Sequence, residues 1–179
     1  DLLYGKVLRS PYPHARILSV DTSKADRLPG VQAVVTGKDI PDEKIGYIQD
    51  RHILARDVVR FVGEPVAIVA ARAIETAEEA LALIDVDYEE LPAVFDAEEA
   101  MKADPPVTIH PDLVRYPRTP VPMLSYRFEP DRPNVFLHRL IRKGDVEKGF
   151  QEADLVMENR FSLPRVHHCQ MEPHATVVQ

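Results

Sequence analysis

The sequence predicts an α+β fold, with two regions of strands and short helices separated by a proline-rich connector. Strand-like and helix-like patterns occur together before residue 102, and strand-like alternation returns after residue 134. Between these regions, residues 104–133 hold eight of the chain's 16 prolines, which remove amide donors and fix φ. We therefore expect one domain over residues 1–102, a connector over residues 103–133 and the first elements of a second α+β domain over residues 134–179.

The first region begins with strand-forming segments. Residues 4–9 and 16–20 are expected to form two short strands. The polar residues 21–23 are good helix caps, so a short helix is expected to run from them to Leu28. Residues 31–35 then predict another strand.

The strongest signals lie in the middle of the first region. Residues 66–71 form a continuous apolar run, which predicts a strand buried on both faces. Thr76 and Glu79 match the Ser/Thr-x-x-Glu capping box and predict the start of a helix. The apolar positions of this helix share one stripe, formed by Ala77, Ala80, Leu81 and Ile84.

An acidic run follows this helix. Asp85, Asp87, Glu89 and Glu90 alternate with apolar or aromatic residues, so we interpret them as the solvated face of a half-exposed strand. Paired carboxylates for acid–base chemistry are the alternative interpretation. Asp96 and Glu99 are expected to cap a short helix that ends at Met101.

The connector and the second region carry weaker patterns. In polyproline geometry the connector would extend over a neighbouring domain, and a free linker is the alternative. A strand is expected over residues 135–141. Gly144 and Asp145 predict the start of a short helix with Val146 and Phe150 on one face. Residues 155–163 alternate and predict a half-buried strand.

The composition favours a globular protein and argues against a nucleic-acid-binding or membrane-spanning one. The chain is 45% apolar and 28% charged, as in globular proteins, and its net charge of −7 argues against a nucleic-acid partner. No apolar run is long enough for a membrane span. Cys169 is the only cysteine, so no intramolecular disulfide can form, and we expect a cytoplasmic location. The chain has no initiator Met and no signal peptide, and both ends suggest a piece of a longer protein.

Three histidines, one cysteine and one glutamate lie together in residues 167–174. These residue types can bind zinc, but their spacing matches no standard zinc pattern. Pro164 and Pro173 also argue against a helix that would place them on one face. We therefore predict a polar loop without a metal, and a small zinc protein is the alternative. His14 and His52 each stand alone and are expected to be surface or structural residues.

Several motifs, in order along nearly the whole chain, resemble one enzyme family. They are GKVLRSPYPHARI (residues 5–17), LPGV (28–31), VVTG (34–37), VRFVGEPVA (59–67), DYEELPAV (87–94), GDVE (144–147) and MEPHA (171–175). The first five resemble the a/b hammerhead domain of the large, molybdopterin-binding subunits of the xanthine dehydrogenase/aldehyde oxidase (molybdenum hydroxylase) family. The last two resemble the start of the molybdopterin-binding domain.

The resemblance implies an oxidoreductase that hydroxylates an aldehyde or an N-heterocycle with oxygen from water at a molybdenum cofactor (molybdopterin). Iron–sulfur clusters and FAD on partner subunits or domains would carry the electrons away. The family's glycine-rich cofactor loop and its catalytic glutamate lie further downstream than this chain reaches. We therefore expect no catalytic, cofactor-binding or metal-binding residue here, and no activity of the chain alone. The expected partners are the remainder of the molybdenum subunit and the iron–sulfur and flavin subunits.

The resemblance also suggests a place for the loop over residues 164–174. In the longer protein, four residues of this loop would form a wall of the substrate pocket. Two other residues of the loop would support its shape. The wall residues are Val166, His167, His168 and Gln170, and the bracing residues are Glu172 and His174. Many family members carry glutamine where this chain has Val166, and some relatives that act on aromatic CoA thioesters lack it, so the substrate class stays open. A buried joint between domains is the alternative for this loop.

Two functions from different classes follow from these observations. The first is the N-terminal part of a molybdenum-cofactor oxidoreductase subunit, which supplies structure and part of a substrate channel without the catalytic base. The alternative is a non-catalytic binding or interaction module with the hammerhead fold.

Overall fold

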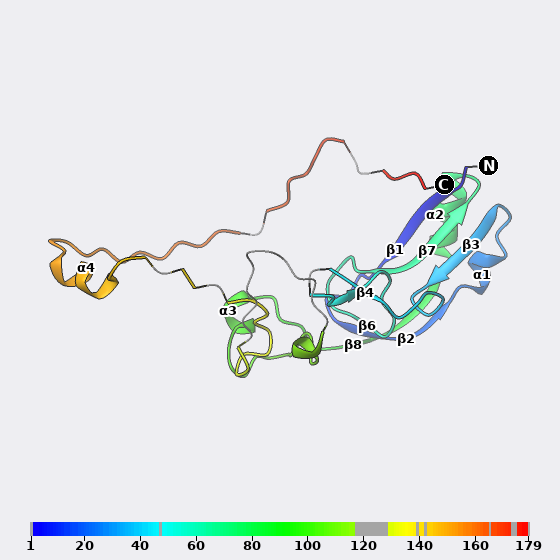
Figure 1. Cartoon of the computed structure of the whole chain (residues 1–179). Coiled ribbons are helices and arrows are strands. Elements are labelled where there is room, and N and C mark those ends of the chain that lie inside the picture. The colour runs from blue at the N-terminus through cyan, green and yellow to red at the C-terminus, as the bar shows by residue number, and fades with distance from the viewer. Residues whose placement is uncertain are drawn as a thin grey trace. The chain divides into compact units, whose positions relative to one another are not determined.

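A computed structural model describes residues 2–46, 48–116, 129–138, 140–141, 143–164, 166–172 and 175–178. The chain divides into two compact units, Asp1–Leu140 and Ile141–Gln179 (Figure 1). The first unit contains all the described strands and three of the four described α-helices, and the second contains the remaining helix. The predicted α+β class is confirmed.

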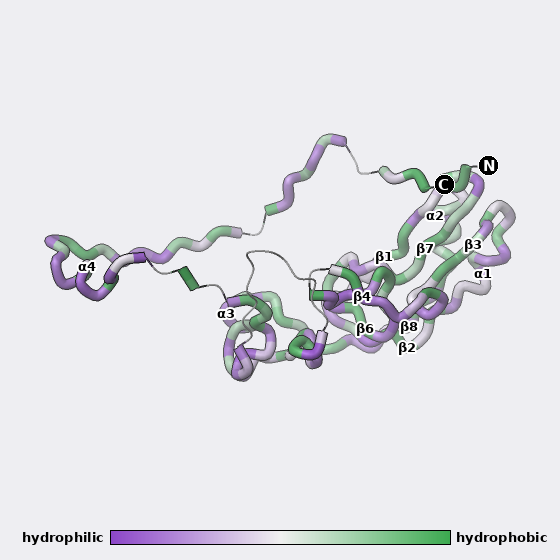
Figure 2. Tube along the Cα trace, in the orientation of Figure 1, coloured by the Kyte–Doolittle hydropathy of each residue, from purple (hydrophilic) through white to green (hydrophobic). Residues whose placement is uncertain are grey.

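A three-stranded antiparallel sheet forms one half of the first unit. Its order is β1 (Tyr4–Arg9), β7 (Pro65–Ala71) and β3 (Val31–Thr36), so the strand that is latest in sequence lies in the centre. Hydrophobic residues run along much of β3 and β7 (Figure 2). Val66 packs into one apolar cluster and Val69 into another, so β7 is buried on both faces, as predicted.

Helix α2 (Ile74–Ala82) packs against this sheet. The predicted stripe is confirmed, since Ala77 and Ala80 are fully buried in the core. The predicted capping box is wrong, because the helix begins two residues before Thr76 and its N-cap, Ala73, makes no side-chain cap. Thr76 instead lies against the turn at Gly30, whose φ of 99° fits glycine.

A second antiparallel sheet has the order β6 (Val58–Val59), β2 (Ala15–Asp21) and β8 (Asp85–Glu90). The four acidic residues of β8 are exposed, and Val86 and Tyr88 between them are half-buried. The interpretation of this run as a solvated strand face is therefore confirmed.

Short elements complete the first unit. The predicted helix after residues 21–23 is α1 (Ser23–Asp26), and β4 (Lys44–Ile45) pairs with β5 (Arg51–His52). The cap on α3 (Ala97–Ala100) is confirmed, since the amide of Glu99 donates to Asp96 Oδ1 at 2.9 Å.

The first part of the proline-rich segment is folded onto the first unit. Residues 104–116 include the 3-10 helix η1 (Leu113–Arg115), and Leu113 is only 6% exposed. Because a buried side chain anchors it, this part is neither a free linker nor an extended polyproline strand. Residues 117–128 lie outside the described part of the chain. The division at about residues 102 and 133 stays a prediction, since packing units need not coincide with the domains of a longer protein.

The second unit contains α4 (Val146–Glu152), whose predicted cap is confirmed by a 3.0 Å hydrogen bond from the amide of Lys148 to Asp145 Oδ1. The strands predicted over residues 135–141 and 155–163 are absent from the described residues of those segments. A strand needs a hydrogen-bonded neighbour, and none pairs with these segments among the described residues. Phe161 and Leu163 are accordingly 86% and 90% exposed. None of the described helices is long and apolar enough to cross a membrane.

Candidate functional site

The first unit contains a cavity of about 450 Å³. It lies where the loop after β3, the segment before β7 and the residues around 110 and 136 meet. Its described lining consists of Gly46, Ile48, Asp50, Arg51, Arg60, Phe61, Glu64, His110, Phe136 and Leu137. Apolar walls with a few polar groups are typical of sites for small ligands.

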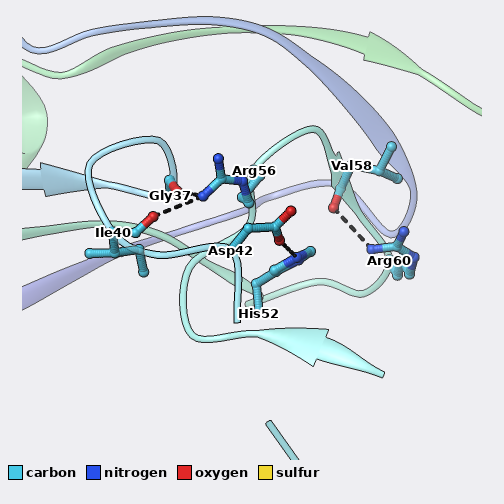
Figure 3. Close-up of polar contacts among 7 residues, drawn as sticks. All are labelled: Gly37, Ile40, Asp42, His52, Arg56, Val58 and Arg60. Carbon is cyan, nitrogen blue, oxygen red and sulfur yellow. Dashed lines mark hydrogen bonds and ion pairs between the residues drawn. The ribbon is translucent and has the colours of Figure 1, made fainter. Parts of the chain in front are cut away.

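Side-chain contacts brace the loop that forms one wall (Figure 3). Nη1 of Arg56 donates to the carbonyl oxygens of Gly37 at 2.7 Å and Ile40 at 2.9 Å. His52 Nε2 lies 2.8 Å from Asp42 Oδ1, and this hydrogen bond lowers the pKa of Asp42. The loop is therefore held by its own polar residues, among them His52.

Glu64 is the most unusual residue of the lining. It is only 4% exposed, and burial raises the pKa of its carboxyl group. Oε2 accepts a 2.6 Å hydrogen bond from the amide of Arg60, and the Glu64 main chain bonds to Ser10. Within the described part of the chain, Glu64 forms no ion pair. A buried carboxyl without a paired cation is costly, so its position points to a role at this cavity.

His110 lies beside Asp50 on another part of the lining. Its Nε2 is 4.0 Å from Asp50 Oδ2, and its Nδ1 is buried without a hydrogen-bond partner. Burial, aided by the charge of Arg60, lowers the pKa of His110 to about 4. The ring is therefore neutral at pH 7, and the neighbouring carboxylate favours the tautomer with hydrogen on Nε2. Nδ1 is then an acceptor without a donor.

Two side chains fix the backbone next to His110. Asn134 Oδ1 accepts from the amide of Ile109 at 2.9 Å, and Asn134 Nδ2 donates to the carbonyls of Ala100 at 3.2 Å and Val107 at 2.8 Å. Arg60 Nε donates to the carbonyl of Ile109 at 3.2 Å. Both backbone groups of Ile109 are thus held by side chains from distant parts of the sequence.

The arrangement is suited to binding. The cavity lining contains no serine, cysteine or lysine that could act as a nucleophile among its described residues. Nowhere in the described ranges do three His, Cys, Asp or Glu residues come together to hold a metal ion.

Sequence reasoning missed this site. Glu64, a charged residue two positions before the apolar run over residues 66–71, was a signal that could have indicated it.

The residues predicted to form a pocket wall lie in the second unit. Val166 is 82% exposed, and His168, Gln170 and Glu172 are also exposed. His167 Nδ1 accepts from the amide of Cys169 at 3.0 Å. His174 lies outside the described residues. Neither this exposure nor this hydrogen bond tests whether the loop lines a substrate pocket. The pocket wall therefore stays a prediction.

Two family models match the chain in succession. The a/b hammerhead domain of aldehyde oxidase and xanthine dehydrogenase matches residues 1–92. The molybdopterin cofactor-binding domain matches residues 128–179.

The chain belongs to the aldehyde oxidase and xanthine dehydrogenase family.

Relatives in this family are similar to almost all of the chain. It is 42% identical to a probable xanthine dehydrogenase subunit of Bacillus subtilis, over 98% of the chain and 21% of that protein. It is 36% identical to the nicotinate dehydrogenase large molybdopterin subunit of Eubacterium barkeri, over 99% of the chain and 37% of that protein. The aldehyde oxidoreductase structure from Desulfovibrio desulfuricans matches with a TM-score of 0.65 at 28% identity, over 86% of the chain and 16% of that structure. The chain therefore spans well under half of these relatives, and the resemblance found in the sequence is confirmed.

Proposed function

We propose that this chain is the N-terminal scaffold of the large subunit of a molybdenum-cofactor oxidoreductase. The longer protein would hydroxylate an aldehyde, an N-heterocycle or an aromatic CoA thioester. The observation that carries the proposal is the succession of a hammerhead match and a cofactor-domain match within one chain. The names of the relatives, which include a xanthine dehydrogenase, a nicotinate dehydrogenase and an aldehyde oxidoreductase, support the aldehyde and the N-heterocycle in this range.

The described residues of the second unit do not by themselves fit molybdopterin. Their pocket is lined by apolar or small residues, namely Val146, Gly149, Phe150, Ala153, Leu155, Val156 and Met157. A phosphate-bearing cofactor needs hydrogen-bond donors or cationic groups, which this lining lacks. The cofactor of the longer protein would therefore be held mainly by residues beyond this chain, and no catalytic step is assigned to residues of this chain.

Several further features belong to the same proposal. Iron–sulfur and flavin subunits would accept the electrons, and the remainder of the molybdenum subunit would be the direct partner. The single cysteine, Cys169, supports a cytoplasmic location, because no disulfide can form within the chain. The proposed domains are a hammerhead domain (1–102), a connector (103–133) and the start of the cofactor domain (134–179).

The proposal predicts that molybdenum and turnover require the longer protein. The purified 179-residue chain should contain no stoichiometric molybdenum and should reduce no dye with aldehyde or heterocyclic substrates. A gene product extended to the length of its relatives, expressed with its partner subunits, should do both. Metal analysis and dye-reduction assays measure the two properties. Molybdenum or turnover in the short chain would contradict the proposal, and an open reading frame that ends at Gln179 would support the non-catalytic hammerhead module.

We further propose that the loop over residues 164–174 lines the substrate pocket of the longer protein, with Glu172 and His174 bracing it. Val166 has no hydrogen-bonding group, so it would shape such a pocket by volume alone. Val166→Gln and His167→Ala in the longer protein should change KM or kcat by roughly tenfold, as expected when a contact of about 1.4 kcal/mol changes. Val156→Gln, which alters another exposed valine of the second unit, is the matched control. Unchanged kinetics with lower thermal stability in both loop variants would show that the loop is only a joint.

A further inference from the structure

Residues 107–116, which we call the strap, close one side of the cavity in the first unit. The strap contributes His110 to the lining, and its described regular structure is the single turn η1. It is attached by the buried side chain of Leu113 and by hydrogen bonds from side chains elsewhere in the sequence. A segment with so few anchors opens at a lower free energy than the core of a protein does.

Two cations contact the strap close to His110. Before His110 in the strap, the carbonyl of Ile109 accepts from Arg60 Nε at 3.2 Å. After it, the ring of Tyr116 lies beneath the ammonium group of Lys44, whose Nζ is 3.9 Å from the ring centroid. The charges of both cations disfavour a further positive charge on His110.

A neutral His110 ring fits its place in the strap, and a protonated ring does not. Nδ1 is buried without a hydrogen-bond partner among the described residues, so no acceptor awaits an added hydrogen. The ring of Tyr116 meets the His110 ring edge-on, at a centroid distance of 5.8 Å. The carboxylate of Asp50 compensates only in part, since Oδ2 lies 4.0 Å from Nε2 and is beyond hydrogen-bonding distance.

We propose that the strap is a proton-operated closure of the cavity, which is shut while His110 is neutral and released when His110 takes up a proton. Because Nδ1 is buried in the shut form, a proton reaches it only while the strap is displaced. The protonated ring is then solvated by water and must lose its proton before the strap closes again. The device belongs to the first unit, so it holds whether or not the longer protein is an oxidoreductase.

The direction of the pH effect follows from the pKa of His110. Burial, aided by the charge of Arg60, lowers this pKa to about 4, whereas a released histidine has a pKa of about 6.5. The shut strap is therefore fully favoured above about pH 6.5, and each pH unit from there down to about 4 favours the open strap roughly tenfold. Glu64 acts in the opposite direction, because its pKa is raised by burial and its protonation relieves a cost. Arg51, which also lines the cavity, keeps its charge throughout.

Amide hydrogen exchange of the 179-residue chain at pH 7.5 and pH 5 tests the proposal. The amides of Ile109, Leu113 and Tyr116 are hydrogen-bonded in the shut strap and report its opening. After correction for the intrinsic effect of pH on exchange, we expect the opening equilibrium to rise roughly 25-fold between the two pH values. The amides of β7 should stay protected, because the central strand does not depend on the strap. An unchanged opening equilibrium, or equal loosening of the strap and β7, would overturn the proposal.

His110→Gln is the decisive variant. Its side chain is polar but uncharged at both pH values, so the rise in the opening equilibrium should fall below about threefold. His14→Gln is the matched control, since His14 contacts the carbonyl of Pro92 and lies outside the described lining of the cavity. This control should keep the full rise. A rise of roughly 25-fold that persists in His110→Gln would show that another group controls the strap.

An NMR titration of the His110 ring decides the question even if His110→Gln does not fold, which circular dichroism will check. In the unmodified chain the ring should stay neutral at pH 5, with its hydrogen on Nε2, the nitrogen nearest to Asp50. A ring that is already protonated at pH 6 in the shut strap would remove the trigger and overturn the proposal.

Discussion

Gly37→Ala is expected to lower the free energy of unfolding of the chain by about 3 kcal/mol. A Cβ atom at this position would clash with the carbonyl oxygen of Ala55 at 2.4 Å and lie 3.0 Å from that of Leu54. Both contacts are with backbone atoms, which cannot rotate away as a flexible side chain would. Leu54 and Ala55 are themselves 1% and 4% exposed, so the strain would spread into the core.

The same change should loosen the wall of the cavity. The Gly37 carbonyl accepts a hydrogen bond from Arg56, which braces the loop (Figure 3). Urea denaturation measures the stability, and faster amide exchange around residues 37–57 would report the loosened loop. Gly5→Ala is the matched control, since its Cβ would meet nothing within 4 Å, and it should be neutral or slightly stabilising. Equal denaturation midpoints for the two variants would contradict the steric argument.

Asn134→Ala should cost about 2–3 kcal/mol, because it removes three hydrogen bonds from a half-buried site. The amide of Ile109 and the carbonyls of Ala100 and Val107 would lose their partner. The segment from residue 100 to 110 would then be less firmly held, although Arg60 still reaches the Ile109 carbonyl. Urea denaturation gives the total effect, and hydrogen exchange at Ile109 gives the local one.

Asn134→Asp separates the acceptor of this side chain from its donors. The aspartate can still accept from the Ile109 amide, but it cannot donate to the two carbonyls. We expect stability to fall while the Ile109 amide stays protected from exchange. Asn159→Ala, at an exposed asparagine of the second unit, should leave both measurements unchanged. If Asn134→Ala behaves like this control, Asn134 does not hold the segment.

Local sequence patterns predicted those elements whose signal is contained in a few neighbouring residues. The run over residues 66–71 became the central strand β7, because its apolar residues can be buried on both faces. Asp96 and Asp145 cap their helices as expected, since an N-cap needs only an amide three residues ahead. The solvated face of β8 followed from alternation alone.

Predictions that depended on distant partners were less successful. The segment over residues 155–163 has the alternation of a strand, but alternation cannot supply the neighbouring strand that would pair with it. The capping box at Thr76 was wrong because α2 already begins at Ile74, which leaves Thr76 inside the first turn of the helix. The first part of the proline-rich segment is held on the first unit by the buried side chain of Leu113. Its local sequence does not indicate this contact.

By itself, the sequence determined the α+β class, most elements of the first unit and, through its ordered motifs, the family. These properties depend on local periodicity or on residues that are adjacent in the chain. Only the tertiary structure decided where the cavity lies, because its lining comes from residues as far apart as Gly46 and Leu137. Glu64 and His110 have perturbed pKa values because folding removes them from water. Burial depends on the whole fold, so the neighbours of these two residues in the sequence do not reveal their perturbed pKa values.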